Sequence, residues 1–355
     1  MQAAAGPVSI GDRQGGLSSI SSCRPPLRLD FIRQTLLDQG LDSNVTSFII
    51  HCIRKSTLSQ YERVWKHFCN YLRINKVSFI DDNIILRFFH HLLIDRKLKV
   101  STLIAYKSAL IDPLHYGFKY NVNNTLVHKL LKGMALTYPN QPVRSPDWSL
   151  NKVLLFIHNN VDNNNIYFNA QKSLFLLSIA LGSRISEIFA LRRGQNFFKK
   201  LSNGSLRIYS DPSFLAKNEK PLNRKGPAFI APFNGPTCDS SICPVKTVEK
   251  YLVLTRRSTE NSLFVHPKTL RKWSIAGMRL AIIRFIRKSQ PECFPRVHDL
   301  QKYATSLAFF NDMIIDDINK SVGWRSAHIF VRHYLQNIER LRFSVSSLNT
   351  SIIRI

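Results

Sequence analysis

The chain has 355 residues, of which 44% are hydrophobic and 21% are charged. This length predicts two domains, because single hydrophobic cores stop growing at roughly 250 to 300 residues. No segment approaches the roughly 18 consecutive apolar residues of a membrane span, and no basic-then-apolar signal segment follows Met1. The composition therefore favours a soluble globular protein and excludes an integral membrane protein.

The net charge is the most informative part of the composition. Lys and Arg number 50 and Asp and Glu 23, which leaves a charge of +27 spread along the chain. A polyanionic partner is expected, because each neutralised phosphate releases counterions and adds affinity. A peripheral membrane protein would carry an amphipathic basic helix with exposed apolar residues, which the sequence does not suggest. RNA is disfavoured because the aromatic residues follow core periodicity and form no evident stacking platform.

The six cysteines form no pairing framework, which fits a reducing compartment. Cys238 and Cys243 form a C-x4-C pair, but no second pair at zinc-finger spacing accompanies them. We predict no metal ion and no cofactor.

The first part of the chain predicts a helical bundle. Residues 1–28 are rich in Gly, Ser and Ala, lack periodicity and are predicted to be disordered. Apolar periodicity predicts helices at 31–40, 44–54, 81–95, 101–114 and 125–136, with another helix beginning after a capping box at Thr57 to Gln60. Residues 29–138 thus form one bundle, and the proline-containing segment 139–148 is a linker.

The second part predicts helices with a small sheet. The helices fall at 149–159, 167–182, 245–256, 274–289, 299–310, 313–320 and 326–338. Two short β-prone stretches, 206–209 and 228–232, flank a polar run and predict antiparallel pairing around a basic loop. The predicted fold class is mainly α with a small antiparallel β-sheet.

The stretch LGSRISEIFALRR, from Leu181, places an arginine at the start of a core helix. Ile185, Ile188 and Phe189 recur at the period of one buried helix face, and Arg184 stands just before them. Taken alone, this pattern fits a solvated arginine beside a capped helix. Four features follow it: Lys217 in the polar run, then the stretches VHDLQKYATSLAFF, VGWRS and FVRHYL.

The order and spacing of these five features resemble the tyrosine recombinase family. Arg184 matches the first arginine motif, and His298 to Gln301 occupies the H-x-x-R motif. Gly323 to Trp324 fits the G-[H/W] motif, and Tyr334, ten residues after Trp324, falls where the nucleophile should be. The upstream stretches RKSTLSQYERVWKHFCNYL and STLIAYKSAL resemble the family's core-binding domain. HDLQKYATSLAF and GWRSAHIFVRHYL are most similar to recombinases of DIRS-like and crypton-like eukaryotic mobile elements.

The resemblance implies a two-domain C-shaped DNA clamp. Residues 29–138 would be the core-binding domain, 149–340 the catalytic domain, and 341–355 a tail able to dock on a neighbouring protomer. The implied activity is site-specific DNA cleavage and rejoining through a 3′-phosphotyrosyl intermediate, without ATP or a metal ion. The partners would be double-stranded DNA recombination sites and further copies of the chain, with a dimer on each site and a tetramer in the synapse. A eukaryotic element would place the protein in the nucleus.

The implied roles suit the residue types. Arg184 can grip two nonbridging phosphate oxygens, and a helix N-terminus also favours an anion. A phenol is a poor nucleophile at neutral pH without a nearby proton acceptor, and His298 is the candidate. Trp324 would pack against the phosphate and donate its indole N–H. Lys217 would protonate the leaving 5′ oxygen, and Lys220 and Lys225 remain alternatives for that role.

Each of these residues also has a purely structural interpretation. Tyr334 fits a half-buried helix aromatic, Trp324 a turn aromatic, His298 a helix cap and Lys217 a solvated loop residue. Their occurrence in family order, together with Arg184, favours the functional interpretation.

Gln301 departs from the family pattern, which has a second arginine there. Glutamine is neutral and lacks the two-pronged grip, so the loss corresponds to about 3–4 kcal/mol of transition-state stabilisation. Three explanations stay open: a decayed or repurposed element copy, an introduced substitution, or compensation by Lys302 or Arg296. We therefore expect either a recombinase, whether or not Gln301 slows it, or a DNA-binding relative with impaired catalysis.

Overall fold

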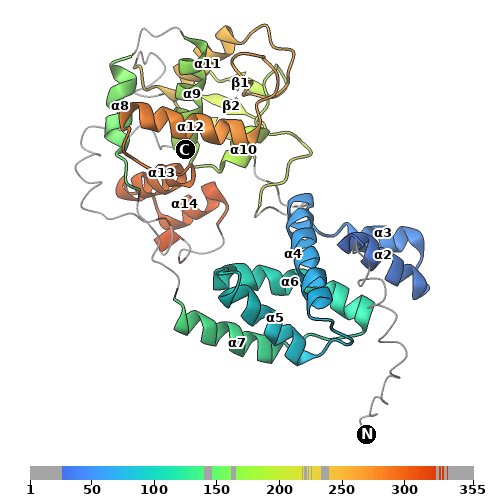
Figure 1. Cartoon of the computed structure of the whole chain (residues 1–355). Helices are drawn as coiled ribbons and strands as arrows, with labels where there is room; N and C mark the ends of the chain where they lie inside the picture. The colour runs from blue at the N-terminus through green and yellow to red at the C-terminus, as the bar shows by residue number, and fades with distance from the viewer. Residues whose placement is uncertain are drawn as a thin grey trace. The chain divides into compact units, whose positions relative to one another are not determined.

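The computed structural model divides into two compact units, Met1–Pro142 and Val143–Ile355 (Figure 1). It describes residues 26–139, 146–160, 165–217, 219, 222, 224, 226–232, 240–324, 328, 330, 331 and 334. The predicted disordered segment 1–28 lies almost wholly outside the described residues, as do most of the predicted linker 139–148 and the whole predicted tail 341–355.

Unit 1 is helical throughout its described part. Its helices are α2 (Arg28–Asp38), α3 (Ser43–Ile50), α4 (Lys55–Ile74), α5 (Asp82–Ile94), α6 (Val100–Phe118) and α7 (Asn124–Thr137). Helix α6 packs against α2, α4, α5 and α7 and so forms the centre of the unit (Figure 1). The core is aromatic: Trp65, Phe68, Phe88 and Phe89 are each at most 1% exposed.

Unit 2 combines helices with one small sheet. Its elements are α8 (Leu150–His158), α9 (Ile166–Leu181), α10 (Ile185–Ala190), β1 (Phe198–Lys200), β2 (Leu206–Ile208), β3 (Ala228–Ile230), α11 (Pro244–Leu254), α12 (Ile275–Ser289), α13 (His298–Phe310) and α14 (Ile315–Val322). Helix α9 packs against α11, α12, α13 and β3. It is buried nearly all round, as a helix at the centre of a core must be.

The sheet has the order β1-β2-β3, and both strand pairs are antiparallel. Leu206, Ile208 and Ile230 face the helices and are at most 2% exposed. The predicted fold class, mainly α with a small antiparallel sheet, is confirmed.

Helix α4 and strand β1 differ from the sequence predictions. Helix α4 begins at Lys55, so Thr57 and Gln60 lie inside it and the predicted capping box is wrong. The helix gains a turn because the carbonyl of Arg54 accepts from the backbone N–H groups of Thr57 and Leu58, both at 2.9 Å. Strand β1 was not predicted, because two of its three residues are lysines, which are depleted in strands.

Within the described residues, no helix is both long enough and apolar enough to cross a membrane.

Lys172 is a buried cation in the middle of α9. It is 6% exposed, and its amine forms no ion pair or hydrogen bond with the described part of the chain. Burial, together with the nearby charge of Lys250, lowers the pKa of Lys172 to about 8. The amine is not one of the fully enclosed unpaired atoms, so water screens part of the penalty for burying its charge, and the remaining cost is about 1–3 kcal/mol.

We expect Lys172→Met to raise the free energy of unfolding at pH 7 by about 1–3 kcal/mol, because methionine fills the same space without a charge. Below pH 8 the Lys172 amine is charged in the folded protein, which then carries the full cost of burying that charge. Between about pH 8 and 10.5 the unfolded chain binds more protons, so the wild type gains stability with rising pH and the advantage of the variant shrinks. Urea unfolding at pH 7 and pH 10 measures both effects.

The exposed Lys152 of α8 supplies the matched control. Lys152→Met should change stability by less than about 0.5 kcal/mol at either pH. An equal gain from Lys172→Met at both pH values would show that the buried amine is not the source of the penalty.

Candidate active site

The end of α9 places Arg184. Gly182 ends the helix with a left-handed φ of +55°, and a Cβ there would also lie only 3.4 Å from the Cβ of Ala304. The chain then turns so that Arg184 becomes the N-cap residue of α10. Its Nη1 donates to Oε1 of Glu187 at 3.1 Å, and both side chains are less than one-fifth exposed. This ion pair holds the guanidinium on one side and leaves it further donors.

Tyr334 and His298 meet although they are far apart in the chain. His298 is the first residue of α13, and its Nε2 lies 2.8 Å from the hydroxyl oxygen of Tyr334. The Tyr334 residue is 8% exposed, and its carbonyl accepts from Oγ of Ser306 at 3.0 Å. Helix α13 therefore positions the phenol at two points.

The protonation states suit transfer of the phenol proton. Burial raises the pKa of Tyr334, while the charge of Arg184 and a hydrogen bond from it act in the opposite direction. His298 is exposed as a whole residue, but partial burial of its imidazole lowers its pKa. The charges of Arg184, Lys302 and Lys217 lower it further against the effect of Asp299. With His298 neutral, the Tyr334 hydroxyl can donate to Nε2, so the imidazole is placed as a proton acceptor for the phenol.

Trp324 packs on the same phenol. Gly323 ends α14 with a φ of +71°, and the Trp324 N–H then donates to the Asn319 carbonyl at 2.8 Å. The Trp324 ring centroid lies 4.0 Å from that of Tyr334. Its Nε1 is buried without an acceptor among the described residues. An unpaired buried donor beside the phenol can serve an oxyanion.

Gln301 is buried on α13, one helical turn after His298. It is 2% exposed, and neither its Oε1 nor its Nε2 has a hydrogen-bond partner in the described part of the chain. Leaving a buried polar group unpaired costs about 1–3 kcal/mol. The two amide atoms of Gln301 are therefore enclosed, but no described residue forms a hydrogen bond with either of them.

The candidate cations differ in placement. Lys217 is exposed in the segment after β2, yet its charge acts on the pKa of His298. Lys220 and Lys225, the alternatives, lie outside the described residues. Lys302 is 6% exposed, and burial lowers its pKa against the effect of Asp299. Arg296 is exposed.

Sequence reasoning missed three supporting residues. Glu187 pairs with Arg184, and the i, i+3 spacing within RISE could have indicated this pair. Asp299, 4% exposed, accepts from Trp148 Nε1 at 3.3 Å and from the Arg296 backbone N–H at 2.9 Å, which anchors the start of α13. No local signal pointed to Ser306, whose partner is 28 residues away.

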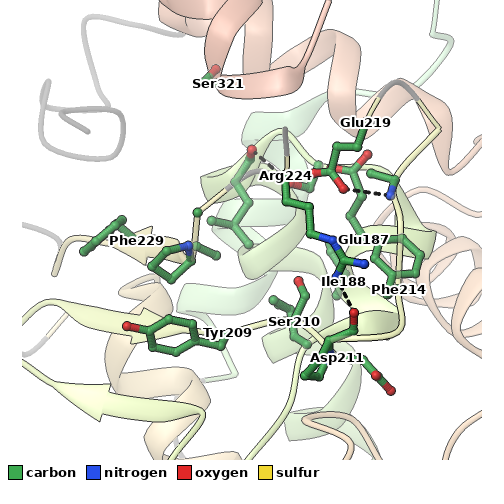
Figure 2. Close-up of a pocket in the computed structure, with 18 of the residues that line it drawn as sticks. Glu187, Ile188, Tyr209, Ser210, Asp211, Phe214, Glu219, Arg224, Phe229 and Ser321 are labelled. Carbon is green, nitrogen blue, oxygen red and sulfur yellow. Dashed lines mark hydrogen bonds between the residues drawn. The ribbon is translucent and has the colours of Figure 1, made fainter. Parts of the chain in front are cut away.

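Unit 2 also contains a cavity of about 500 Å³, and Glu187 is one of the residues that line it. Glu187 and Ile188 of α10 line it with Tyr209, Phe214 and other residues (Figure 2). Arg224 extends across it and donates to the carbonyl of Pro212. Since neither Tyr334 nor His298 lines this cavity, it is separate from the phenol site.

The described residues contain no cluster of three or more His, Cys, Asp or Glu side chains arranged to hold a metal ion.

The fold is that of solved tyrosine recombinases. XerH recombinase bound to its difH substrate in a pre-cleavage complex is 14% identical, with a TM-score of 0.58 over 94% of this chain and 96% of that chain. XerH in a post-cleavage complex with palindromic difH gives 13% identity and a TM-score of 0.61 over the same shares. Lambda integrase, solved as a tetramer bound to a Holliday junction, is 12% identical in sequence. Its TM-score is 0.51, over 87% of this chain and 77% of that chain.

No family model matches the sequence, and no curated protein matches it. At these low identities the solved structures establish the fold of this chain and not its chemistry.

Proposed function

We propose that the protein cleaves and rejoins DNA through a phosphotyrosyl intermediate on Tyr334. The Tyr334 oxygen attacks the scissile phosphorus and its proton passes to His298 Nε2. The bond between phosphorus and the 5′ oxygen breaks, and Lys217 protonates that oxygen. Attack by a 5′ hydroxyl on the phosphotyrosine reverses these transfers and rejoins the strand. Arg184 and the indole N–H of Trp324 stabilise the charge on the nonbridging oxygens.

The contact between Tyr334 and His298 is the observation that carries this proposal. A buried phenol 2.8 Å from an imidazole whose pKa is lowered, and within reach of the Arg184 charge, suits a nucleophile with its proton acceptor in place. The alternative of ordinary core packing explains the burial of the ring but does not require a histidine and an arginine at its oxygen.

The wider setting is part of the same proposal. XerH and lambda integrase have this fold and were solved on DNA, the latter as a tetramer on a four-way junction. We propose double-stranded DNA recombination sites as the substrate, with a dimer on each site and a tetramer in the synapse. The +27 charge supports a polyanionic partner. A DIRS-like or crypton-like mobile element as the source, DNA integration as its role and the nucleus as its place rest on the sequence resemblance.

A randomised substrate tests this proposal without requiring a defined DNA site. Wild-type protein is incubated with a pool of nicked duplexes whose sequence is randomised around the nick, so that cleavage releases a short strand and traps the intermediate. We expect a denaturant-resistant protein-DNA adduct, and mass spectrometry of its peptides should place the nucleotide on Tyr334. An adduct on another residue contradicts the proposal. So does the absence of any adduct at protein concentrations that saturate DNA binding.

One observation favours a second candidate, a DNA-binding relative with impaired catalysis. Gln301 offers a neutral amide where the resemblance calls for a guanidinium. This candidate predicts salt-sensitive DNA binding with no adduct from the wild-type chain.

A further inference from the structure

The outer face of the small sheet carries a row of three side chains. Side chains alternate along each strand, so residues in register share a face. Lys199 of β1 lies opposite Arg207 of β2, and Arg207 lies opposite Phe229 of β3. The neighbouring residues on β2, Leu206 and Ile208, face the core instead. The face away from the core therefore presents two cations and one aromatic ring.

The positive charges of this row have no acidic partner among the described residues. Like charges directly opposite each other on antiparallel strands are destabilising. Neither Lys199 nor Arg207 forms an ion pair with the described residues. Lys200, the next residue of β1, differs: its amine lies 2.7 Å from Oε1 of Glu249 on α11. The cation on the core side of the strand is neutralised within the protein, while the two on the outer side are not.

Arg207 is also held in place with a donor unused. Its guanidinium carbon lies over the Phe229 ring, 4.9 Å from the ring centroid, in a cation–π contact. Its Nε is buried and has no acceptor among the described residues. The buried Nε is not open to a ligand, but Arg207 as a whole is partly exposed, so its terminal nitrogens, next to a second cation, are the groups that suit an anionic oxygen.

We propose that Lys199 and Arg207 bind one backbone phosphate of DNA on the outer face of the sheet. This inference rests on the proposed function for the identity of the ligand. The sheet belongs to the same compact unit as the phenol site, and its strands β2 and β3 flank the segment that carries Lys217, whose charge acts on His298. An acidic peptide offers similar oxygens, but the +27 charge of the whole chain favours nucleic acid.

A phosphate contact of this kind has a defined effect. It anchors the duplex without reading its sequence, and it does not touch the reacting phosphorus. Neutralising the row should therefore weaken binding on all sequences about equally. It should leave the rate of adduct formation unchanged once DNA is saturating.

The experiment compares three full-length variants. Lys199→Gln removes one cation of the row, and the double variant Lys199→Gln with Arg207→Gln removes both. Lys200→Gln is the matched control on the same strand. Fluorescence anisotropy gives the dissociation constant for a duplex at low and at physiological salt. One lost phosphate contact should lower the slope of log K against log salt by about 0.9 and weaken binding about fivefold near physiological salt. Lys200→Gln should leave the slope unchanged.

The outcomes separate this inference from the proposed function. If both variants that lack Lys199 keep the wild-type slope of log K against log salt, the inference is overturned and the enzyme proposal stays intact. If the variants lower this slope but the wild-type protein forms no adduct, phosphate binding by Lys199 and Arg207 is supported and DNA cleavage through Tyr334 is rejected. Loss of binding to a polyglutamate peptide, with DNA binding unchanged, assigns the row to an acidic protein partner and overturns it for DNA. Lys199 is exposed, so its single variant still tests the row if the double variant unfolds.

Discussion

Tyr334→Phe is expected to abolish the covalent protein-DNA adduct. The substitution removes the attacking oxygen, and losing a nucleophile costs about 10⁴-fold or more in rate. The ring should stay packed against Trp324, so the fold and the affinity for DNA should persist. Loss of the hydrogen bond to His298 should cost about 1 kcal/mol of stability. The adduct is measured by denaturing electrophoresis with labelled nicked DNA, and binding by anisotropy.

Tyr209→Phe is the matched control for this variant. Tyr209 belongs to the same unit but lines the separate cavity beside Glu187 (Figure 2). Its loss of a hydroxyl should leave adduct formation within about twofold of wild type. If Tyr334→Phe still forms the adduct while Tyr209→Phe does not, the nucleophile has been assigned to the wrong tyrosine.

Gln301→Arg is expected to accelerate adduct formation by about 10² to 10³-fold. A guanidinium at this position would add a charged donor for the nonbridging oxygens, worth about 3–4 kcal/mol in the transition state. The site is enclosed, since Gln301 is 2% exposed and both its amide atoms lack partners among the described residues. The measurement is the single-turnover rate on the trapped substrate.

The same substitution has an opposite effect on the protein without DNA. An arginine buried there carries an uncompensated charge, which is strongly unfavourable until a phosphate arrives. We therefore expect Gln301→Arg to lower the melting temperature of the free protein and DNA to restore it. Gln301→Met is the control: it removes two unpaired polar atoms, so it should stabilise the free protein by about 1–3 kcal/mol and slow cleavage further.

A folded Gln301→Arg protein that is no faster than wild type would show that Gln301 does not limit the reaction. Lys302 would then be the strongest candidate for the missing cation. It is buried one residue away, and its charge already acts on His298. If the wild-type chain forms no adduct and Gln301→Arg does, the result favours a wild-type binding protein with impaired catalysis.

Much of the architecture was predictable because it depends on neighbouring residues. The apolar period of 101–114 and of 274–289 indicated α6 and α12, since one helix face repeats every three or four residues. The order of Arg184, His298, Trp324 and Tyr334 along the chain carried the resemblance to tyrosine recombinases, whose fold the structure has. Strand β1 escaped prediction because a lysine-rich segment becomes a strand only through its pairing with β2.

The meeting of the site residues was decided by tertiary packing. Arg184 and Tyr334 are 150 positions apart in the chain. Their approach requires α9, α10 and α13 to pack in one particular way, and no local pattern encodes that arrangement. The same holds for the enclosure of Gln301, the burial of Lys172 and the unpaired row on the sheet. Periodicity within a helix is a local property, whereas burial and charge compensation depend on which distant segments fold against a residue.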